Sequence, residues 1–89
     1  MAKYTVYTLD VWGNAEDGWD VNDRCRAGSV DIPDDASESD ILRIMVDSDV
    51  ACGPIGTATI RDSDGSFIEI DRKKDGRPLF TLEREPGDE

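Results

Sequence analysis

The stretch TATIRDSDGSFIEIDRKKDGRPLFTLE, residues 57–83, contains three short runs of β-branched, aromatic and other apolar residues. These runs are Thr57–Asp62, Ser66–Asp71 and Pro78–Glu83, and glycine, proline or clustered charges lie between them. Such side chains are typical of strands, and the intervening sequences have the composition of tight turns. The stretch therefore predicts three antiparallel strands joined by two hairpin turns.

The register of the first hairpin follows from which pairing buries apolar side chains together. A three-residue loop with Gly65 in the left-handed region pairs Ile60 with Ile68 and Ala58 with Ile70. A two-residue turn would instead place Ile60 opposite a glutamate and would mix the core face with the solvent face. We therefore predict the three-residue loop.

The first third of the chain predicts two further strands. Lys3–Trp12 is rich in β-branched and aromatic residues, but its apolar residues change parity midway, which predicts either two covered faces or a bulge. Trp19–Arg26 can return beside it, and Ser29–Ile32 can continue that strand past a kink at Gly28. A regular strand would place four side chains on one face: Trp19, Val21, Asp23 and Cys25.

The one clear helix of the sequence runs from Ser37 to Ser48. Ser37 is a suitable N-cap, and the acidic residues that follow it are favoured by the positive end of the helix dipole. Gly53-Pro54 rules out a continuation of the helix. Four apolar residues recur at helical spacing and predict the stripe that faces the sheet: Ile41, Leu42, Met45 and Val46.

Together these elements predict an α+β fold. We expect a mostly antiparallel sheet of about five strands with one helix packed on one face, in the order β-β-α-β-β-β. A chain of 89 residues has room for one domain. We expect residues 1–84 to form this single acidic domain and residues 85–89 to form a flexible C-terminal tail.

The chain is strongly acidic, with 21 acidic and 10 basic side chains and a net charge of −11. A field of this sign repels nucleic acid and anionic membranes, so we expect no direct contact with either. It favours a protein partner that is basic or binds nucleic acid, although such a charge can also serve solubility alone. No apolar run approaches a membrane span and the first residues lack the apolar segment of a signal peptide, so we expect a cytoplasmic protein.

The residues that bond-making chemistry needs do not form a recognisable group. Histidine is absent, and Cys25 lies between two arginines that would point to the opposite face of a strand. We therefore expect Cys25 and Cys52 to be free thiols, buried or half-buried, and we expect no catalytic residue and no cofactor. Residues 60–71 match a calcium-binding loop at only some positions, and two cysteines cannot fill a zinc site, so no metal site is predicted.

The segment DVWGNAEDGWDVND, Asp10–Asp23, concentrates both tryptophans among aspartates, asparagines and glycines. Tryptophan beside polar residues near a turn is typical of a binding hot spot. The alternative is that at least one tryptophan is a buried core residue and that the polar side chains cap turns. Seven residues of the segment are candidates for binding a partner: Trp12, Asn14, Asp17, Trp19, Asp20, Asn22 and Asp23.

The same segment carries a family resemblance. Asp10–Asn14 followed by Asp17–Asp23 gives a D-x-W-G-N-x-x-D-G-W-x-V-N-D type of motif, which resembles small acidic bacteriophage proteins of unassigned function. The likeness extends loosely to Asp75–Leu79 and the strand that follows. The resemblance implies a phage accessory protein that acts in the host bacterial cytoplasm, and it transfers no catalytic residue.

These observations favour a small acidic, non-enzymatic protein-interaction module. One alternative is an inhibitor of a nucleic-acid-binding enzyme that imitates DNA, of the anti-restriction or anti-CRISPR kind, which needs an ordered stripe of uncompensated carboxylates. Another is a homo-oligomeric structural protein that uses a sheet edge or the basic segment Arg72–Arg77. The helix and the residues around it supply the candidate acidic face: Asp31, Asp34, Asp35, Glu38, Asp40, Asp47 and Asp49.

Overall fold

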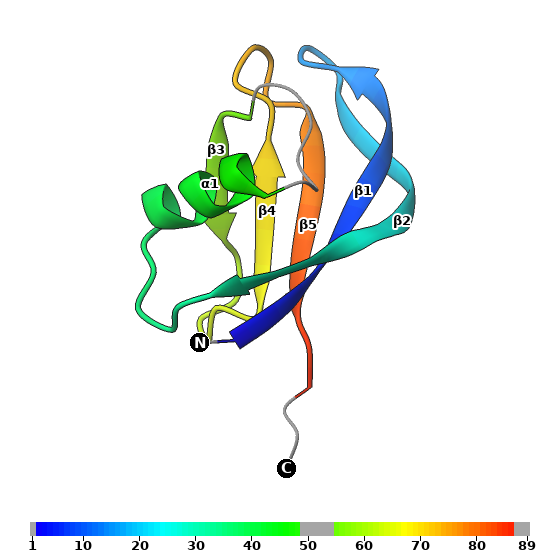
Figure 1. The fold of residues 1–89 in the computed structure, drawn as a ribbon. Helices are drawn as coiled ribbons and strands as arrows, with labels where there is room; N and C mark the ends of the chain where they lie inside the picture. The colour runs from blue at the N-terminus through cyan, green and yellow to red at the C-terminus, as the bar shows by residue number, and fades with distance from the viewer. Residues whose placement is uncertain (1, 49–54, 87–89) are drawn as a thin grey trace.

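In the computed structural model, which describes residues 2–48 and 55–86, the chain forms a five-stranded antiparallel sheet and one helix (Figure 1). The elements are β1 (Ala2–Asn14), β2 (Gly18–Ile32), α1 (Glu38–Asp47), β3 (Thr57–Ile60), β4 (Phe67–Asp71) and β5 (Pro78–Arg84). The strand order across the sheet is β2-β1-β5-β4-β3, so the first and last strands of the chain pair with each other at its centre. The predicted α+β class and element order are confirmed.

The hairpin of β3 and β4 has the predicted register. Ile60 pairs with Ile68, and Ala58 pairs with Ile70. Gly65 in the connecting turn has a φ of 75°, which is the left-handed conformation that the loop requires. Because Ala58, Ile68 and Ile70 are all buried, this register places the apolar side of both strands in the core.

Helix α1 begins with a capping box. The Ser37 hydroxyl accepts a hydrogen bond from the Asp40 amide at 3.2 Å, and the Asp40 carboxylate accepts one from the Ser37 amide at 3.1 Å. Two amide donors that the helix leaves unpaired are thereby satisfied. The hydrogen bonds of Asp40 with Ser37 also lower the pKa of the Asp40 carboxyl from its usual value of 3.8.

The helix buries a slightly different stripe from the predicted one. Ile41 and Met45 are 1% and 0% exposed, and Leu42 and Ile44 are partly buried against the core. Val46 is 65% exposed, so its predicted place in the stripe was wrong. Val46 follows Ile41 by five residues, about 140° around a helix of 3.6 residues per turn, and therefore points away from the sheet.

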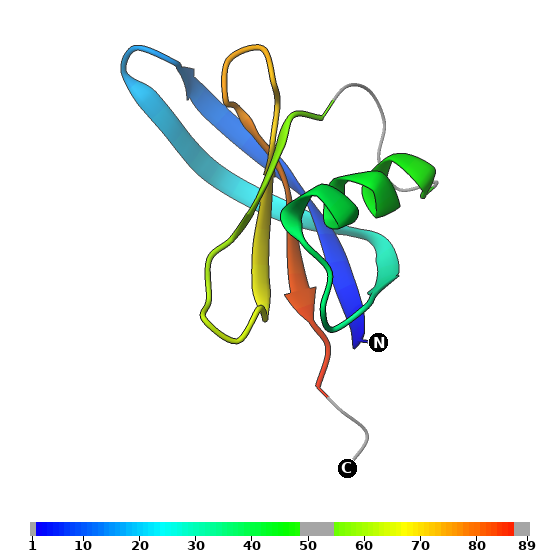
Figure 2. The same ribbon diagram turned by 90° about the vertical axis from the view of Figure 1, so that its left-hand side faces the viewer.

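A single core fills the space between the helix and one face of the sheet. Figure 2 shows α1 lying across that face, and within the described residues no helix covers the opposite face. We call these the helix face and the open face of the sheet. Burial of each large aliphatic side chain contributes about 1.5–3 kcal/mol, so the core accounts for much of the stability. The core residues are Tyr4, Val6, Val30, Ile32, Ile41, Met45, Ala58, Ile68, Ile70, Phe80 and Leu82.

Strand β2 contains two bulges. The β1–β2 register shifts between Val6 and Tyr7 and again between Asp10 and Val11, which leaves Ala27 and Asn22 of β2 without a pairing partner. Each extra residue reverses the faces of the residues beyond it and increases the twist of the ribbon. A bulge was one of the two explanations predicted for the irregular first strand, but the extra residues lie in its partner.

The bulge at Asn22 corrects one expectation about faces. Trp19 and Val21 lie opposite Gly13 and Val11, whereas Asp23 and Cys25 lie opposite Asp10 and Thr8. Paired residues share a face, and β1 alternates without interruption. Trp19 and Val21 therefore lie on the open face, and Asp23 and Cys25 lie on the helix face, so the four do not share one face.

Candidate functional site

The end of the β1–β2 ribbon extends beyond the rest of the sheet. Pairing between β1 and β5 covers only Tyr4–Thr8, whereas pairing between β1 and β2 continues to the turn. Residues 9–14 and 18–24 therefore form a two-stranded projection, which we call the arm (Figure 2). Most side chains of the arm are exposed, whereas Val11 is buried and Leu9 and Trp19 are half-buried.

The turn of the arm is held by asparagine and glycine. The Asn14 side-chain oxygen accepts hydrogen bonds from the amides of Glu16 and Asp17 at 2.9 and 2.8 Å. Gly13 has a φ of 110°, and a Cβ there would lie 2.3 Å from the main-chain oxygen of Gly18. Asn14 and Asp17, two of the predicted binding residues, thus serve the turn.

One face of the arm combines an exposed indole with carboxylates. Trp12 is 64% exposed and lies directly opposite Asp20, and the next pair along this face is Asp10 with Asp23. We call these four residues the tryptophan face. Asn22 donates from its amide to the Asp10 carboxylate at 3.2 Å, so the residue at the bulge holds the edge of this face in place.

The opposite side of the arm is apolar and is part of the open face. Along both strands of the arm, its side chains alternate with those of the tryptophan face, and they belong to Leu9, Val11, Trp19 and Val21. Val21 is 54% exposed. Neither tryptophan belongs to the buried core, contrary to the alternative that at least one does: Trp12 is exposed and Trp19 is half-buried. The two indoles point to opposite sides of the arm and do not form one patch.

The predicted binding residues therefore separate into three groups. Trp12, Asp20 and Asp23 lie together on the tryptophan face, Trp19 lies on the other side, and the remaining members hold the turn or the bulge: Asn14, Asp17 and Asn22. Asp10 belongs to the tryptophan face but was missing from the predicted set. Its spacing of two from Trp12 within a strand was the signal that could have identified it.

The candidate acidic face is partly used for contacts within the chain. The Glu38 carboxylate accepts a hydrogen bond from the Ile60 amide at 2.9 Å, Asp40 caps the helix, and Asp31 lies opposite Lys3 in the sheet. Glu38 and Asp40 therefore accept hydrogen bonds within the chain, and Asp40 also lies 3.8 Å from the Arg43 guanidinium. Of the other members, Asp34, Asp35 and Asp47 are exposed. Asp49 lies outside the described residues.

The β4–β5 turn accounts for the basic segment. Arg72 donates two hydrogen bonds to Asp75, at 2.9 and 2.6 Å, and this pairing lowers the pKa of Asp75 from 3.8 to about 2. Arg77 donates to the main-chain oxygen of Val11 at 3.1 Å. Lys73 and Lys74 are exposed, so two of the four cations are committed to the fold.

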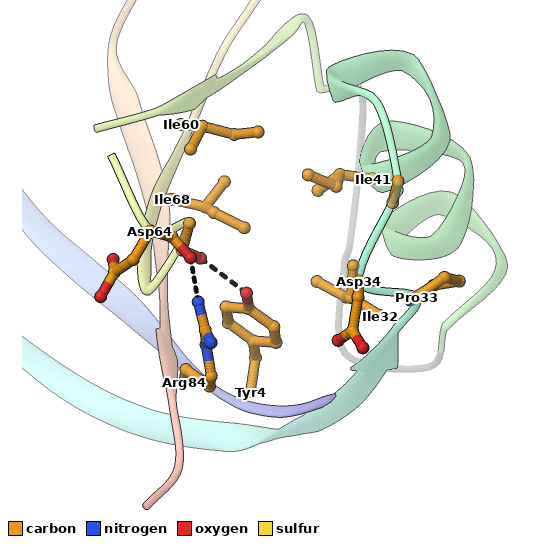
Figure 3. A pocket seen from close by; sticks show the side chains of 11 residues that line it. Tyr4, Ile32, Pro33, Asp34, Ile41, Ile60, Asp64, Ile68 and Arg84 are labelled. Carbon is orange, nitrogen blue, oxygen red and sulfur yellow. Dashed lines mark hydrogen bonds between the residues drawn. The ribbon is translucent and has the colours of Figure 1, made fainter. Parts of the chain in front are cut away.

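A small cavity lies between the residues before α1 and the β3–β4 turn (Figure 3). It has a volume of about 170 Å³, and isoleucine side chains such as Ile41 and Ile68 form much of its wall. At its mouth the Tyr4 hydroxyl donates to the Gly65 oxygen at 2.6 Å, and the Arg84 guanidinium donates to the Asp64 oxygen. These polar groups are bonded to main-chain oxygens and serve the packing of the turn.

Several expectations concern chemistry at single residues. Cys25 is a free thiol, as expected, but it is exposed rather than buried. It is exposed because it lies on the edge strand β2, beyond the part of the sheet that α1 covers. Cys52 lies outside the described residues. No group of three or more acidic or cysteine side chains within residues 2–48 and 55–86 is arranged to hold a metal ion. No helix in the described part of the chain is long and apolar enough to cross a membrane.

The geometry thus identifies the tryptophan face of the arm as the strongest candidate site. Its features are an exposed aromatic ring, nearby carboxylates and a turn fixed by hydrogen bonds. Comparison with protein families, with curated proteins and with solved structures finds no match to the chain.

Proposed function

We propose that the chain is a non-enzymatic protein-interaction module whose tryptophan face binds a basic segment of another protein. The observation that carries the proposal is the 64% exposure of Trp12 directly opposite Asp20, with Asp10 and Asp23 as the next pair. An exposed indole costs hydration free energy that burial against a partner recovers. Tryptophan is also the aromatic residue that best attracts a lysine or arginine side chain.

The charges around Trp12 favour a cationic partner. The register places Arg24 and Arg26 on the opposite side of the ribbon, so neither lies on the tryptophan face. The net charge of −11 would also speed the approach of a basic partner and repel an acidic one. A role as a phage accessory protein in the host cytoplasm fits this proposal and rests on the motif alone.

Other binding modes have less support. Imitation of DNA would need free carboxylates in a stripe, and Glu38 and Asp40 accept hydrogen bonds from within the chain. Assembly through a sheet edge is opposed at both edges. At one edge, β2 is interrupted by two bulges. At the other edge, the Ile60 amide of β3 already donates its hydrogen bond to the Glu38 carboxylate.

The test is affinity capture from a bacterial lysate at low and high salt. The wild-type chain is compared with Trp12→Ala, with the double variant Asp20→Asn/Asp23→Asn, and with the control Val46→Ala, which removes an equally exposed apolar group from the helix. We expect basic proteins that the wild type and the control retain at low salt and that both arm variants lose. The same proteins retained by all four chains would refute the proposal.

A further inference from the structure

A polar hollow lies at the base of the arm, on the same side as Trp12. Its volume is about 330 Å³. The residues that line it are Thr8, Leu9, Asp10, Asp23, Arg24 and Cys25. Two of the lining pairs are successive on one face of the ribbon: Asp10 with Asp23, and Thr8 with Cys25. Both pairs are exposed, so the hollow opens to solvent beside the tryptophan face.

The two carboxylates of the hollow are oriented by hydrogen bonds within the arm. The Asp10 carboxylate accepts one from the Asn22 side-chain amide at 3.2 Å. The Asp23 carboxylate accepts one from the Arg24 main-chain amide at 2.8 Å. The second oxygen of each carboxylate has no hydrogen-bond partner in the described part of the chain. Because acceptors that are already held in place lose less entropy on binding, the hollow is prepared for a donor that reaches both strands.

The carboxylates of the tryptophan face have no counter-charge within the described residues. None of Asp10, Asp20 and Asp23 forms an ion pair there. The guanidinium of Arg24 pairs with Glu83 on the other side of the ribbon. Three uncompensated charges around one ring and one hollow therefore favour an occupant with more than one positive charge.

The ring and the hollow are one strand repeat apart. Trp12 pairs with Asp20, and the next pair on this face is Asp10 with Asp23. Alternate residues of a strand are about 6.4–6.8 Å apart, and an extended chain laid along the ribbon has the same repeat. Side chains that are separated by one residue in such a chain can therefore reach the ring and the hollow together.

We propose that the partner segment is extended and carries two cationic side chains separated by one residue, one stacked on the Trp12 ring and the other, an arginine, inserted between Asp10 and Asp23. This inference rests on the proposed function and specifies the sequence pattern of the partner. Arginine suits the hollow because the several N–H donors of its planar guanidinium can serve carboxylates on two strands at once. The Thr8 hydroxyl donates to the Cys25 main-chain oxygen at 3.3 Å and can itself accept a further N–H at the inner wall. At the ring, lysine and arginine both suffice.

The test is the affinity of the full chain for short labelled peptides, measured by fluorescence anisotropy at one salt concentration. Peptides of about nine residues are too short to be stable helices in water and can bind extended. One peptide carries Arg-Gly-Arg, a second carries the same residues as Gly-Arg-Arg, and a third carries Lys-Gly-Lys, all in one glycine-serine background. We expect Arg-Gly-Arg to bind about fivefold more tightly than either of the others, because it alone places suitable groups at both positions.

Two changes locate the source of that preference. Asp23→Asn keeps an oxygen that accepts from the Arg24 amide but removes a charge of the hollow, and it is expected to abolish the preference. Alkylation of Cys25 by N-ethylmaleimide, in a Cys52→Ser chain, fills the hollow without a change of charge and is expected to do the same. Asp47→Asn removes an exposed carboxylate of the helix, serves as the matched control and is expected to keep the preference.

Equal affinity of the wild type for all three peptides, or no binding of any of them, would overturn the inference. A preference that persists after both changes in the hollow would overturn it as well. The proposed function fails separately, when the capture experiment finds the same basic proteins on the wild type and on Trp12→Ala. Peptides that bind with equal affinity and are lost with Trp12→Ala would leave the proposed function standing and remove only the spacing of the two cations.

Discussion

Arg77 donates a hydrogen bond to the main-chain oxygen of Val11 at 3.1 Å, and so joins two segments that are 66 residues apart in the sequence. Val11 lies in the arm and Arg77 in the turn between β4 and β5. The contact braces the arm where pairing with β5 has already ended. The position of the tryptophan face therefore depends on a residue outside the arm.

Replacement of Arg77 by Met should loosen the arm. A hydrogen bond that involves a charged group contributes about 1.5–3 kcal/mol, and partial exposure places the expected loss at the low end. We expect faster amide hydrogen exchange in residues 9–14 and 18–24, with little change in β4. Lys73→Met makes the same change of charge at an exposed neighbour and should leave exchange in the arm unchanged.

The two glycines at the ends of the arm turn should differ in their tolerance of alanine. Gly13 and Gly18 have φ values of 110° and 98°, so a side chain at either position strains the backbone, at roughly 1–3 kcal/mol. A Cβ at Gly13 would also lie 2.3 Å from the Gly18 oxygen, whereas a Cβ at Gly18 has nothing within 4 Å. Urea unfolding should therefore rank Gly13→Ala as the more destabilising change. Equal losses would contradict the geometry of this turn.

The rotation of helix α1 can be tested with two neighbouring residues. Met45 is fully buried and Val46 is 65% exposed. We expect Met45→Ala to cost about 2–5 kcal/mol, which is a large part of the stability of a small domain. Val46→Ala should change the free energy of unfolding by less than about 0.5 kcal/mol. A comparable loss for both variants would support the helix face that the sequence predicted.

The elements that the sequence predicts well are those whose local signals agree. The register of β3 and β4 follows from pairing Ala58 with Ile70 and Ile60 with Ile68, since a one-residue shift would place apolar side chains of one strand opposite polar side chains of the other. The capping box of the helix is equally local. No comparable pattern in the sequence marks the bulge at Asn22, because Trp19, Val21, Asp23 and Cys25 keep the two-residue spacing of a regular strand on both sides of it. The faces of Asp23 and Cys25 depend on that extra residue, and the exposure of Trp12 depends on the pairing of β1 with β5 stopping at Thr8.

Asp75 should support the fold only above acidic pH. Its pairing with Arg72 lowers its pKa from 3.8 to about 2, so the charged form is favoured by folding. The stabilisation is complete above the ordinary pKa and is lost as the pH falls towards 2. Urea unfolding should therefore give a lower stability for Asp75→Asn at pH 6, and the difference from the wild type should shrink between pH 4 and pH 2. Asp47→Asn makes the same change of charge at an exposed position on the helix and serves as the control for the loss of one negative charge.

Asp71, in the same hairpin, should behave in the opposite way. Burial raises the pKa of its carboxyl, and the nearby charge of Glu69 raises it further. Folding therefore favours the protonated form, and the contribution of this group is present at low pH and lost as the pH rises through its pKa. Asp71→Asn keeps the shape of the side chain and should be more stable than the wild type at pH 7, with the gain disappearing near pH 3. Asp75→Asn serves as the control of opposite sign, because both variants remove one carboxylate beside the same turn. A loss of stability for both variants at pH 7 would contradict the expectation that burial disfavours the charged form of Asp71.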